Sequence, residues 1–464
     1  MFDTAADKLR NDPRLQKARD LIARAMADAQ RHIDGPRPAD PQRSERYQQL
    51  LDAFAKRRGG ALPIPYLGSG LGRGPFVELM DGSVKYDMIC GIGVHGLGHS
   101  DAGLTSAGID GALADAIMQG NLQQNAESAD LCDELVERAC RGGATLSHCF
   151  LTTSGSMAND NALKIILQKH APADRMLAFS QCFTGRTLAM ASLTDKAAYR
   201  DGLPETMKVG YLPFYKPDDR EKSIASTIKH LDNHVARYQG RVAGVMFEMI
   251  QGEGGYNAGD ASFFHAVMSR CKEHGLAVWV DEIQSFGRTS QPFAFQHYGL
   301  DSLVDVVSVG KMTQVCATLF TPAYNPRPGL ISQTFTGASS QIFAAREVLR
   351  RLDEGGVFGD DGLNMTYRKR FADELTAIHL RHPDKLSARH FGEGTMIGFE
   401  VFGGEAEKTK AVMNRLYDLG VIAFLCGSSP LRLRFLPPVS VMQEADVQAV
   451  CQLLEQAIID VAAD

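Results

Sequence analysis

Between about residues 112 and 340, short apolar runs rich in β-branched residues alternate with amphipathic stretches. The runs lie at 242–250, 276–280 and 304–309, and the stretch from Ala261 to Gly275 has its apolar residues at helical spacing. This alternation predicts βαβ units, because amphipathic helices cross over between buried parallel strands. We therefore expect an α/β fold in which a large domain, residues 112–340, contains a mostly parallel sheet.

Polar residues follow these runs at their carboxyl ends, namely Glu248, Glu253, Asp281, Gln284 and Lys311. Asp281 ends the run that begins at Leu276, and Lys311 ends the run that begins at Val304. Ligands of open α/β sheets bind at that edge. An amine that forms a Schiff base and a carboxylate that keeps a pyridine nitrogen protonated are the groups that hold pyridoxal phosphate. A lone lysine there is more often solvated, so the hypothesis depends on other segments.

The flanking segments predict an arm and a smaller α+β domain. Residues 1–60 are polar and helix-prone and are interpreted as an N-terminal helical arm. Residues 61–111 are rich in glycine and short apolar runs, with a hairpin expected to turn at Asp81-Gly82. We expect them to form the N-terminal part of the small domain, and residues 341–464, which resume helix, strand and helix, to form its C-terminal part.

Bulk composition bounds the class of protein. The chain has 464 residues, 44% hydrophobic and 22% charged, with a formal net charge of -6, which is typical of a soluble globular protein and gives no basic surface for nucleic acid. Neither a run of about 18 apolar residues nor a signal-peptide core occurs, which argues against a membrane partner. Nine scattered cysteines without a Cys-x-x-Cys pair favour reduced thiols and a cytoplasmic location.

A candidate anion site lies at Thr153-Ser-Gly-Ser-Met-Ala-Asn, just before a helix-forming run. A helix N-terminus with free backbone N–H groups and a glycine suits a phosphate. The alternative is an ordinary N-cap, which Ser154 or Ser156 would supply in any case.

Cys182-Phe-Thr-Gly-Arg offers an aromatic ring and a cation around a turn. Phe183 could stack on a flat cofactor ring, and Arg186 could bind a carboxylate bidentately. The alternative is a core phenylalanine beside a surface arginine.

Two further turns carry polar side chains. Glu248-Met-Ile-Gln-Gly-Glu-Gly-Gly follows an apolar run and places Glu253 on a glycine-rich turn, although by itself it is a polar loop. In Asp281-Glu-Ile-Gln, the amide of Gln284 could hydrogen-bond a ring oxygen of the cofactor.

His95 and His99 are four residues apart, but the glycines between them argue against a metal-binding helix, and we predict no metal site. The glycine series from Gly68 to Gly74 lacks the spacing of a dinucleotide-binding loop.

Taken in order, these segments resemble the class III (ω-amino acid) aminotransferases of fold type I, the aspartate aminotransferase-like pyridoxal phosphate enzymes. The resemblance covers about residues 75–460. Its motifs are Ser154-Gly-Ser, Phe183-Thr-Gly-Arg, Gln251-Gly-Glu-Gly-Gly, Asp281-Glu-Ile-Gln, Gly310-Lys, Thr334-Phe-Thr-Gly and Arg434-Phe-Leu-Pro-Pro.

The resemblance implies that pyridoxal 5'-phosphate is the cofactor. Lys311 would be the Schiff-base lysine and the general acid and base, and Asp281 the partner of the pyridine nitrogen. Gly155 and Ser156 would hold the phosphate.

It also implies that Phe183 stacks on the ring and that Gln284 contacts the phenolic oxygen. Thr334 would reach the phosphate of the neighbouring subunit, so a homodimer with shared sites is expected.

For the substrates, the resemblance makes Arg434 the arginine that binds the α-carboxylate. Glu253 would neutralise this arginine when a substrate enters by its distal amine, and Arg186 is a candidate for the donor's α-carboxylate. A pairable glutamate and arginine let one pocket accept an ω-amine donor and then a 2-oxo acid.

Some residues depart from the common family pattern. Met157 replaces a common acidic residue, Thr184 replaces the usual histidine, and the loop after Gln284 is shorter by one residue. The Thr-Gln-Val-Cys segment that ends at Cys316 resembles the lysine 6-aminotransferases.

The expected reaction is transfer of the terminal amino group of an amino acid, with L-lysine as the first candidate, to 2-oxoglutarate, giving a semialdehyde and glutamate. Alternatives are ornithine, 4-aminobutyrate or another amine as donor, a pyridoxal phosphate-dependent aminomutase, and a relative that binds a ligand without turnover.

Overall fold

The computed structural model describes residues 4–115 and 118–463. These residues divide into two compact units. One contains residues up to 114 together with 367–390 and those from 397 onward, and the other contains residues 115–366 and 391–396. The main division thus falls after residue 366, whereas the sequence pattern placed it after residue 340. The difference is the segment that holds α12 (Ser339–Glu354), which packs against α6 (Ala126–Cys140) of the larger unit.

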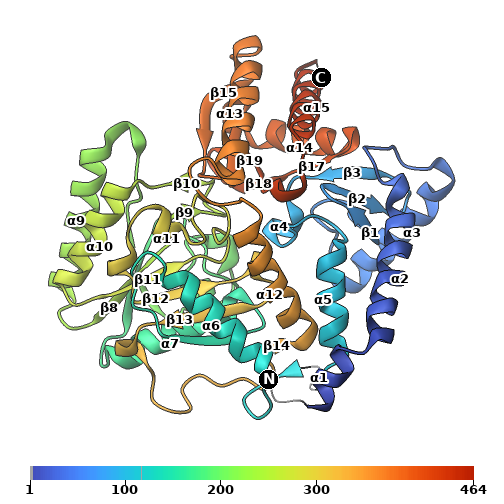
Figure 1. Ribbon diagram of the computed structural model, residues 1–464. Helices are drawn as coiled ribbons and strands as arrows, with labels where there is room; N and C mark the ends of the chain where they lie inside the picture. Colours follow the sequence, from blue (N-terminus) through green and yellow to red (C-terminus); the bar gives the residue numbers. More distant parts are fainter. Residues whose placement is uncertain (1–3, 116–117, 464) are drawn as a thin grey trace. The chain divides into compact units, whose positions relative to one another are not determined.

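The larger unit is built on a seven-stranded sheet with the order β5-β13-β12-β11-β8-β6-β7. Figure 1 labels β8, β11, β12 and β13 of this sheet. Strand β11 pairs in parallel with β8 and β12, β6 pairs in parallel with β8 and β7, and β13 alone is antiparallel to its neighbours β12 and β5. The expected parallel-rich α/β sheet is confirmed. Its strands are β5 (His148–Thr152), β6 (Arg175–Phe179), β7 (Lys208–Leu212), β8 (Val242–Phe247), β11 (Ala277–Asp281), β12 (Val306–Val309) and β13 (Cys316–Phe320).

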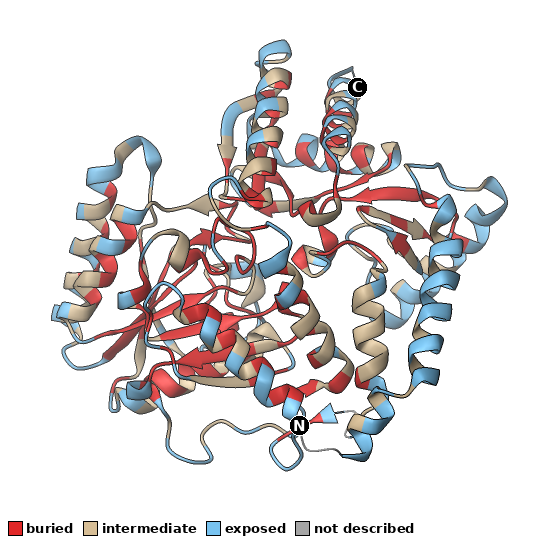
Figure 2. Ribbon diagram, viewed as in Figure 1, coloured by how far each residue is buried: buried red, intermediate tan, exposed pale blue. Residues whose placement is uncertain are grey.

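The central strands are the apolar runs of the sequence. Every residue of β8, β11 and β12 is buried, as parallel strands covered on both faces require (Figure 2). The helices of this unit, besides α6 and α12, are α7 (Gly155–Lys169), α8 (Leu188–Leu193), α9 (Arg220–Arg237), α10 (Ala261–Glu273) and α11 (Ala294–His297). Helix α10 packs against β11 and α9, and α7 packs against β12 and β13.

The chain reverses directly after Lys311, which the sequence pattern did not predict. Residues Lys311–Thr313 form a short 3-10 turn, and β13 then runs back beside β12. Lys311 has φ +54° and Gln314 φ +60°, a left-handed conformation that costs an L-residue roughly 1–3 kcal/mol. The cofactor-lysine candidate therefore lies on a turn that the surrounding strands hold in place.

The other unit contains two four-stranded sheets, with the orders β1-β2-β3-β17 and β15-β16-β19-β18. The predicted hairpin is confirmed, because β2 and β3 pair antiparallel around Gly82 at φ +82°. The strands are β1 (Gly68–Arg73), β2 (Phe76–Leu79), β3 (Val84–Asp87), β15 (Leu386–Phe391), β16 (Ile397–Val401), β17 (Val421–Ile422), β18 (Phe424–Gly427) and β19 (Leu431–Phe435).

Described residues 4–60 contain the α-helices α1 (Ala5–Arg10), α2 (Pro13–Ala29) and α3 (Pro41–Arg58). The remaining long helices of this unit are α5 (Ala102–Ala112), α13 (Leu363–Arg381), α14 (Ala406–Leu419) and α15 (Glu444–Ala463). Among the helices that the structure describes, none combines the length and the apolar character needed to cross a bilayer.

Candidate active site

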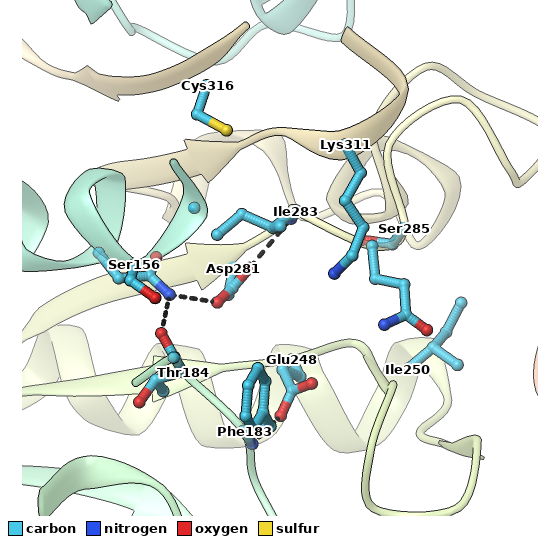
Figure 3. A pocket seen from close by; sticks show the side chains of 14 residues that line it. Ser156, Phe183, Thr184, Glu248, Ile250, Asp281, Ile283, Ser285, Lys311 and Cys316 are labelled. Atoms are coloured by element: carbon cyan, nitrogen blue, oxygen red, sulfur yellow. Dashed lines mark hydrogen bonds between the residues drawn. The ribbon is translucent and has the colours of Figure 1, made fainter. Parts of the chain in front are cut away.

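The larger unit contains a cavity of about 210 Å³ at the carboxyl ends of β8, β11 and β12 and the first turn of α7 (Figure 3). Side chains from five separated segments line it. Six of its lining residues are site residues named from the sequence: Gly155, Ser156, Phe183, Asp281, Gln284 and Lys311. Tertiary folding therefore brings together these six cofactor candidates, whereas Thr334, the seventh, does not line the cavity.

Asp281 and Lys311 reach the cavity from the ends of adjacent strands. The register of β11 and β12 places Asp281 beside Ser308, three residues before Lys311. The Asp281 carboxylate accepts hydrogen bonds from Nδ2 of Asn159 at 2.7 Å and from the N–H of Ile283 at 2.9 Å. These bonds fix the direction in which the carboxylate faces.

Burial raises the pKa of Asp281, while its bonds to Ile283 and Asn159 and the charge of Lys311 act in the opposite direction. A buried carboxylate gains most from a cation placed directly against it. The site is therefore suited to a ligand that brings a positively charged ring nitrogen to Asp281.

The first turn of α7 forms a close-fitting anion cradle. Oγ of Ser154 caps the helix by accepting from the N–H of Met157 at 3.2 Å. A Cβ added to Gly155 would lie 2.9 Å from Ile283 Cδ1, and one added to Gly185 would lie 2.3 Å from Ser156 Oγ. Both glycines thus allow close approach at the positive end of the helix dipole, which suits a phosphate.

Phe183 reaches the cavity from the loop after β6. Its backbone N–H donates to the Glu248 carboxylate at 2.8 Å, and its ring meets Tyr199 edge-on with centroids 6.0 Å apart. In Figure 3, Phe183 and Ile283 lie on opposite sides of the Asp281 carboxylate. This arrangement favours a flat ring that faces Asp281 with its edge.

Asn159 is a site residue that the motifs did not single out. Its Nδ2 donates to Asp281 and also to the backbone carbonyl of Thr184, each at 2.7 Å. Its Oδ1 is buried without a hydrogen-bond partner among the described residues. Asn159 follows Gly155 by four residues on α7, so helical spacing was a signal that could have found it.

Two departures from the family pattern also lie at the cavity. The hydroxyl of Thr184 donates to the carbonyl of Met190 at 2.9 Å, so it stabilises its own loop. Cys316 begins β13, and a Cβ on Gly310 would lie 2.8 Å from its Sγ. Burial raises the pKa of the Cys316 thiol to about 11. The other lining residues, to which the sequence assigned no role, are Gly185, Glu248, Ile250, Ile283 and Ser285.

The remaining candidates do not line this cavity. Arg186 is exposed, with its guanidinium 3.4 Å from the centre of the Tyr199 ring. Glu253 is half-buried in the turn after β9 (Ile250–Gln251), and Thr334 lies exposed in a loop. Arg434 belongs to β19 of the other unit, where it is fully buried and its guanidinium lies 5.7 Å from the centre of the Phe424 ring.

The histidine pair remains a loop feature of the smaller unit. Nε2 of His99 lies 2.9 Å from Oδ2 of Asp87, and the His95 and His99 rings are 4.7 Å apart. Within residues 4–115 and 118–463, no group of three or more histidine, cysteine, aspartate or glutamate side chains is arranged to hold a metal ion.

Comparison with known proteins identifies the family. The model of the aminotransferase class III family matches residues 66–458. The chain belongs to this family. It is 31% identical over 393 residues to the acetylornithine aminotransferase of Bacillus subtilis, an alignment that covers 83% of this chain and 93% of that protein.

Two solved structures share the fold of this aminotransferase. The lysine aminotransferase from Mycobacterium tuberculosis has a TM-score of 0.78 at 21% identity and covers 89% of this chain and 99% of its own. The ornithine aminotransferase from Toxoplasma gondii has a TM-score of 0.74 at 20% identity, covering 90% and 98%. At such identities the likeness shows the fold, which is fold type I as expected.

The aminotransferase is therefore a pyridoxal phosphate-dependent enzyme, and the cavity fits this cofactor. The α7 cradle suits its phosphate, the buried carboxylate of Asp281 suits its ring nitrogen, and Nζ of Lys311 suits its aldehyde. The family, the fold, the enzyme class and the cofactor expected from the sequence are confirmed.

Proposed function

We propose that this aminotransferase takes the terminal amino group of an amino acid, with L-lysine as the first donor to test, and transfers it to 2-oxoglutarate. The observation that carries the reaction is the joint placement of Lys311, Asp281 and the α7 cradle at one cavity. The preference for a terminal amine is supported by the similarity to aminotransferases named for acetylornithine, lysine and ornithine.

When bound, pyridoxal phosphate supplies an aldehyde carbon that takes up the donor's nitrogen and a protonated ring that stabilises negative charge on the neighbouring carbon. We propose that Nζ of Lys311 holds the cofactor and, once the donor has displaced it, takes the proton from the donor carbon that carries the amine. Asp281 keeps the ring nitrogen protonated, and Asn159 keeps Asp281 oriented.

The other site residues have proposed roles in binding. Gly155 and Ser156 hold the phosphate, Phe183 covers one face of the ring, and Gln284 contacts the phenolic oxygen. Thr334 contacts the phosphate of a neighbouring subunit, so the functional enzyme is proposed to be a homodimer. A cytoplasmic location is proposed as well.

From the family resemblance, we propose that Arg434, which is fully buried, binds the α-carboxylate of the 2-oxo acid in one half-reaction. Glu253 is proposed to neutralise this arginine when the donor enters by its distal amine. Arg186 is proposed to bind the donor's α-carboxylate, because its guanidinium is exposed and its backbone N–H donates to Oγ of the cavity residue Ser156 at 3.2 Å.

A second donor, N-acetylornithine, is favoured by the 31% identity to an acetylornithine aminotransferase. It differs from lysine by a shorter chain and by the absence of an α-ammonium charge. Ornithine and 4-aminobutyrate are further candidate donors, and the assays described next compare all four.

Steady-state assays with a panel of amines test the proposal. We expect glutamate to form from 2-oxoglutarate only when a donor with a terminal amine is present, and we expect kcat/KM to be highest for lysine. A higher kcat/KM for N-acetylornithine would replace lysine as the donor. Isomerisation of an amino acid without any 2-oxo acid would instead identify an aminomutase.

A further inference from the structure

Glu248 links two loops that carry proposed site residues. It directly follows β8, and each of its carboxylate oxygens accepts a hydrogen bond from a different loop. Oε2 accepts from the N–H of Phe183 at 2.8 Å, and Oε1 accepts from the N–H of Gly252 at 3.1 Å. The first loop carries the ring proposed to cover the cofactor, and the second carries Glu253 at the next position. Figure 3 shows Glu248 beside Phe183 at the cavity.

The two loops also contact one another away from the cavity. Nε2 of Gln251 donates to the carbonyl of Ser180 at 2.7 Å, and Nδ2 of Asn257 donates to Oε1 of Gln181 at 3.1 Å. These bonds join the bases of the loops. The bonds of Glu248 join them at the cavity, where the proposed functional side chains begin.

The turn at Gly252 also determines where Gln284 can lie. A Cβ on Gly252 would come within 2.6 Å of Nε2 of Gln284, so this glycine packs directly against the amide. A shift of the turn would therefore move Gln284 as well as Glu253.

We propose that Glu248 is a positioning residue, whose side chain holds the Phe183 loop and the Gly252 turn in a fixed relative position at the cofactor pocket. The inference rests on the roles proposed for Phe183 and Glu253. In this arrangement, Glu248 transmits any displacement of the ring-covering loop to the turn that carries the substrate-neutralising carboxylate.

The environment of Glu248 supports a geometric role. The residue is 8% exposed and lies beside Asp281, because β8 and β11 run parallel with Phe247 opposite Val280. Burial, and then the charge of Asp281, raises the pKa of Glu248 to about 8. A second acid so close to Asp281 is unfavourable for stability. Glutamine would have the same shape, but its single carbonyl oxygen would leave one backbone N–H facing an NH₂ group.

The test is a double-variant cycle on cofactor affinity. Apoprotein is titrated with pyridoxal phosphate for wild type, Glu248→Gln, Phe183→Ala and the double variant, and the circular dichroism of the bound cofactor is recorded. We expect Glu248→Gln to weaken binding about tenfold, the equivalent of one backbone hydrogen bond that becomes unfavourable. Because both substitutions act through the same loop, Glu248→Gln should add less than about twofold to the loss caused by Phe183→Ala.

A second double-variant cycle, in which Glu253→Gln replaces Phe183→Ala, tests the other loop. The quantity measured is KM for the amine donor. Glu248→Gln should raise KM for the donor, and this effect should be largely absent in the Glu253→Gln background. Asp305→Asn is the matched control. The Asp305 carboxylate also accepts a backbone bond, from the N–H of Val278 at 2.8 Å, but Asp305 directly precedes β12 and does not line the cavity. Its substitution should leave cofactor affinity within about twofold.

Two results would overturn the positioning role. One is a double variant whose loss of cofactor affinity equals the product of the losses in Glu248→Gln and Phe183→Ala. The other is wild-type cofactor affinity in Glu248→Gln. If Phe183→Ala alone binds the cofactor normally, the role of Phe183 is wrong and the inference fails with it. If Glu248→Gln does not fold, Glu248→Asp takes its place in the cycle, because a shorter carboxylate cannot reach both loops.

Discussion

Glu248 and Asp281 are carboxylates at the ends of neighbouring parallel strands, and the structure gives them different surroundings. Asp281 accepts bonds from Asn159 and Ile283 and lies close enough to Lys311 for its charge to act on the carboxyl pKa. Among the described residues, Glu248 accepts from the backbone N–H groups of Phe183 and Gly252, and its pKa is raised by burial and by the charge of Asp281. Of the two, Asp281 is therefore the one suited to face a cationic ring.

The raised pKa of Glu248 predicts a pH dependence of apoprotein stability. Its folded-state value of about 8 lies above the ordinary 4.5, so the folded protein retains a proton that the unfolded chain loses. This stabilisation is complete below pH 4.5 and is lost as pH rises through 8, a total on the order of 4 kcal/mol. Glu282, whose pKa burial raises to about 7, acts in the same direction but over a narrower range.

The Tm of the apoprotein, measured between pH 5 and 9 for wild type, Glu248→Gln and Glu282→Gln, tests this assignment. The decline between pH 7 and 8 should disappear in Glu248→Gln and persist in Glu282→Gln. A decline of equal size in all three proteins would assign it to other groups.

At this scale, the sequence predicted residues that are chemically distinctive at a strand end or in a turn, such as Lys311, Asp281 and Phe183. It assigned no role to Asn159 or to Glu248, although Glu248 follows an apolar run of the sequence. Their importance depends on which backbone or carboxylate atoms lie opposite them. Those neighbours are determined by the orientation of a helix face and by the register of paired strands, not by residue type.

The start of α7 depends on glycines in two separate elements. Gly185 has φ +130°, and a Cβ there would lie 2.3 Å from Oγ of Ser156. Gly185→Ala should therefore displace the first turn of α7 and weaken pyridoxal phosphate binding at least tenfold, about 1.4 kcal/mol or more. Gly143→Ala is the control, since Gly143 has φ +103° and nothing within 4 Å of the added Cβ.

Cofactor titration and Tm are measured for both glycine variants. The control should lose stability through backbone strain but keep cofactor affinity. Equal affinity in the two variants would contradict the cradle at α7.

Among the elements, strands β8, β11 and β12 were predictable because continuous burial requires continuous apolar runs. The reversal into β13 was not, because the chain turns through left-handed Lys311 and Gln314 rather than through glycine or asparagine. The local sequence disfavours that turn, and only the pairing of β13 with β12 and β5 accounts for it.

For the whole molecule, the order of the motifs along the chain predicted the family, the fold and the cofactor. The match of the aminotransferase class III family model to residues 66–458 confirms them. Motif order identifies the residues that the family shares, but it carries little information about which donor an individual member uses. For this reason the sequence resolved the reaction class better than the substrate.

The central claim is that Lys311 holds the cofactor and that a terminal amine reacts there. It is tested by the visible absorption spectrum of protein reconstituted with pyridoxal phosphate, recorded for wild type and Lys311→Ala. We predict a visible band near neutral pH in the wild type that L-lysine bleaches and 2-oxoglutarate restores, and no such band in the variant. A colourless wild type that cannot be reconstituted, or an unchanged band in Lys311→Ala, would contradict the account.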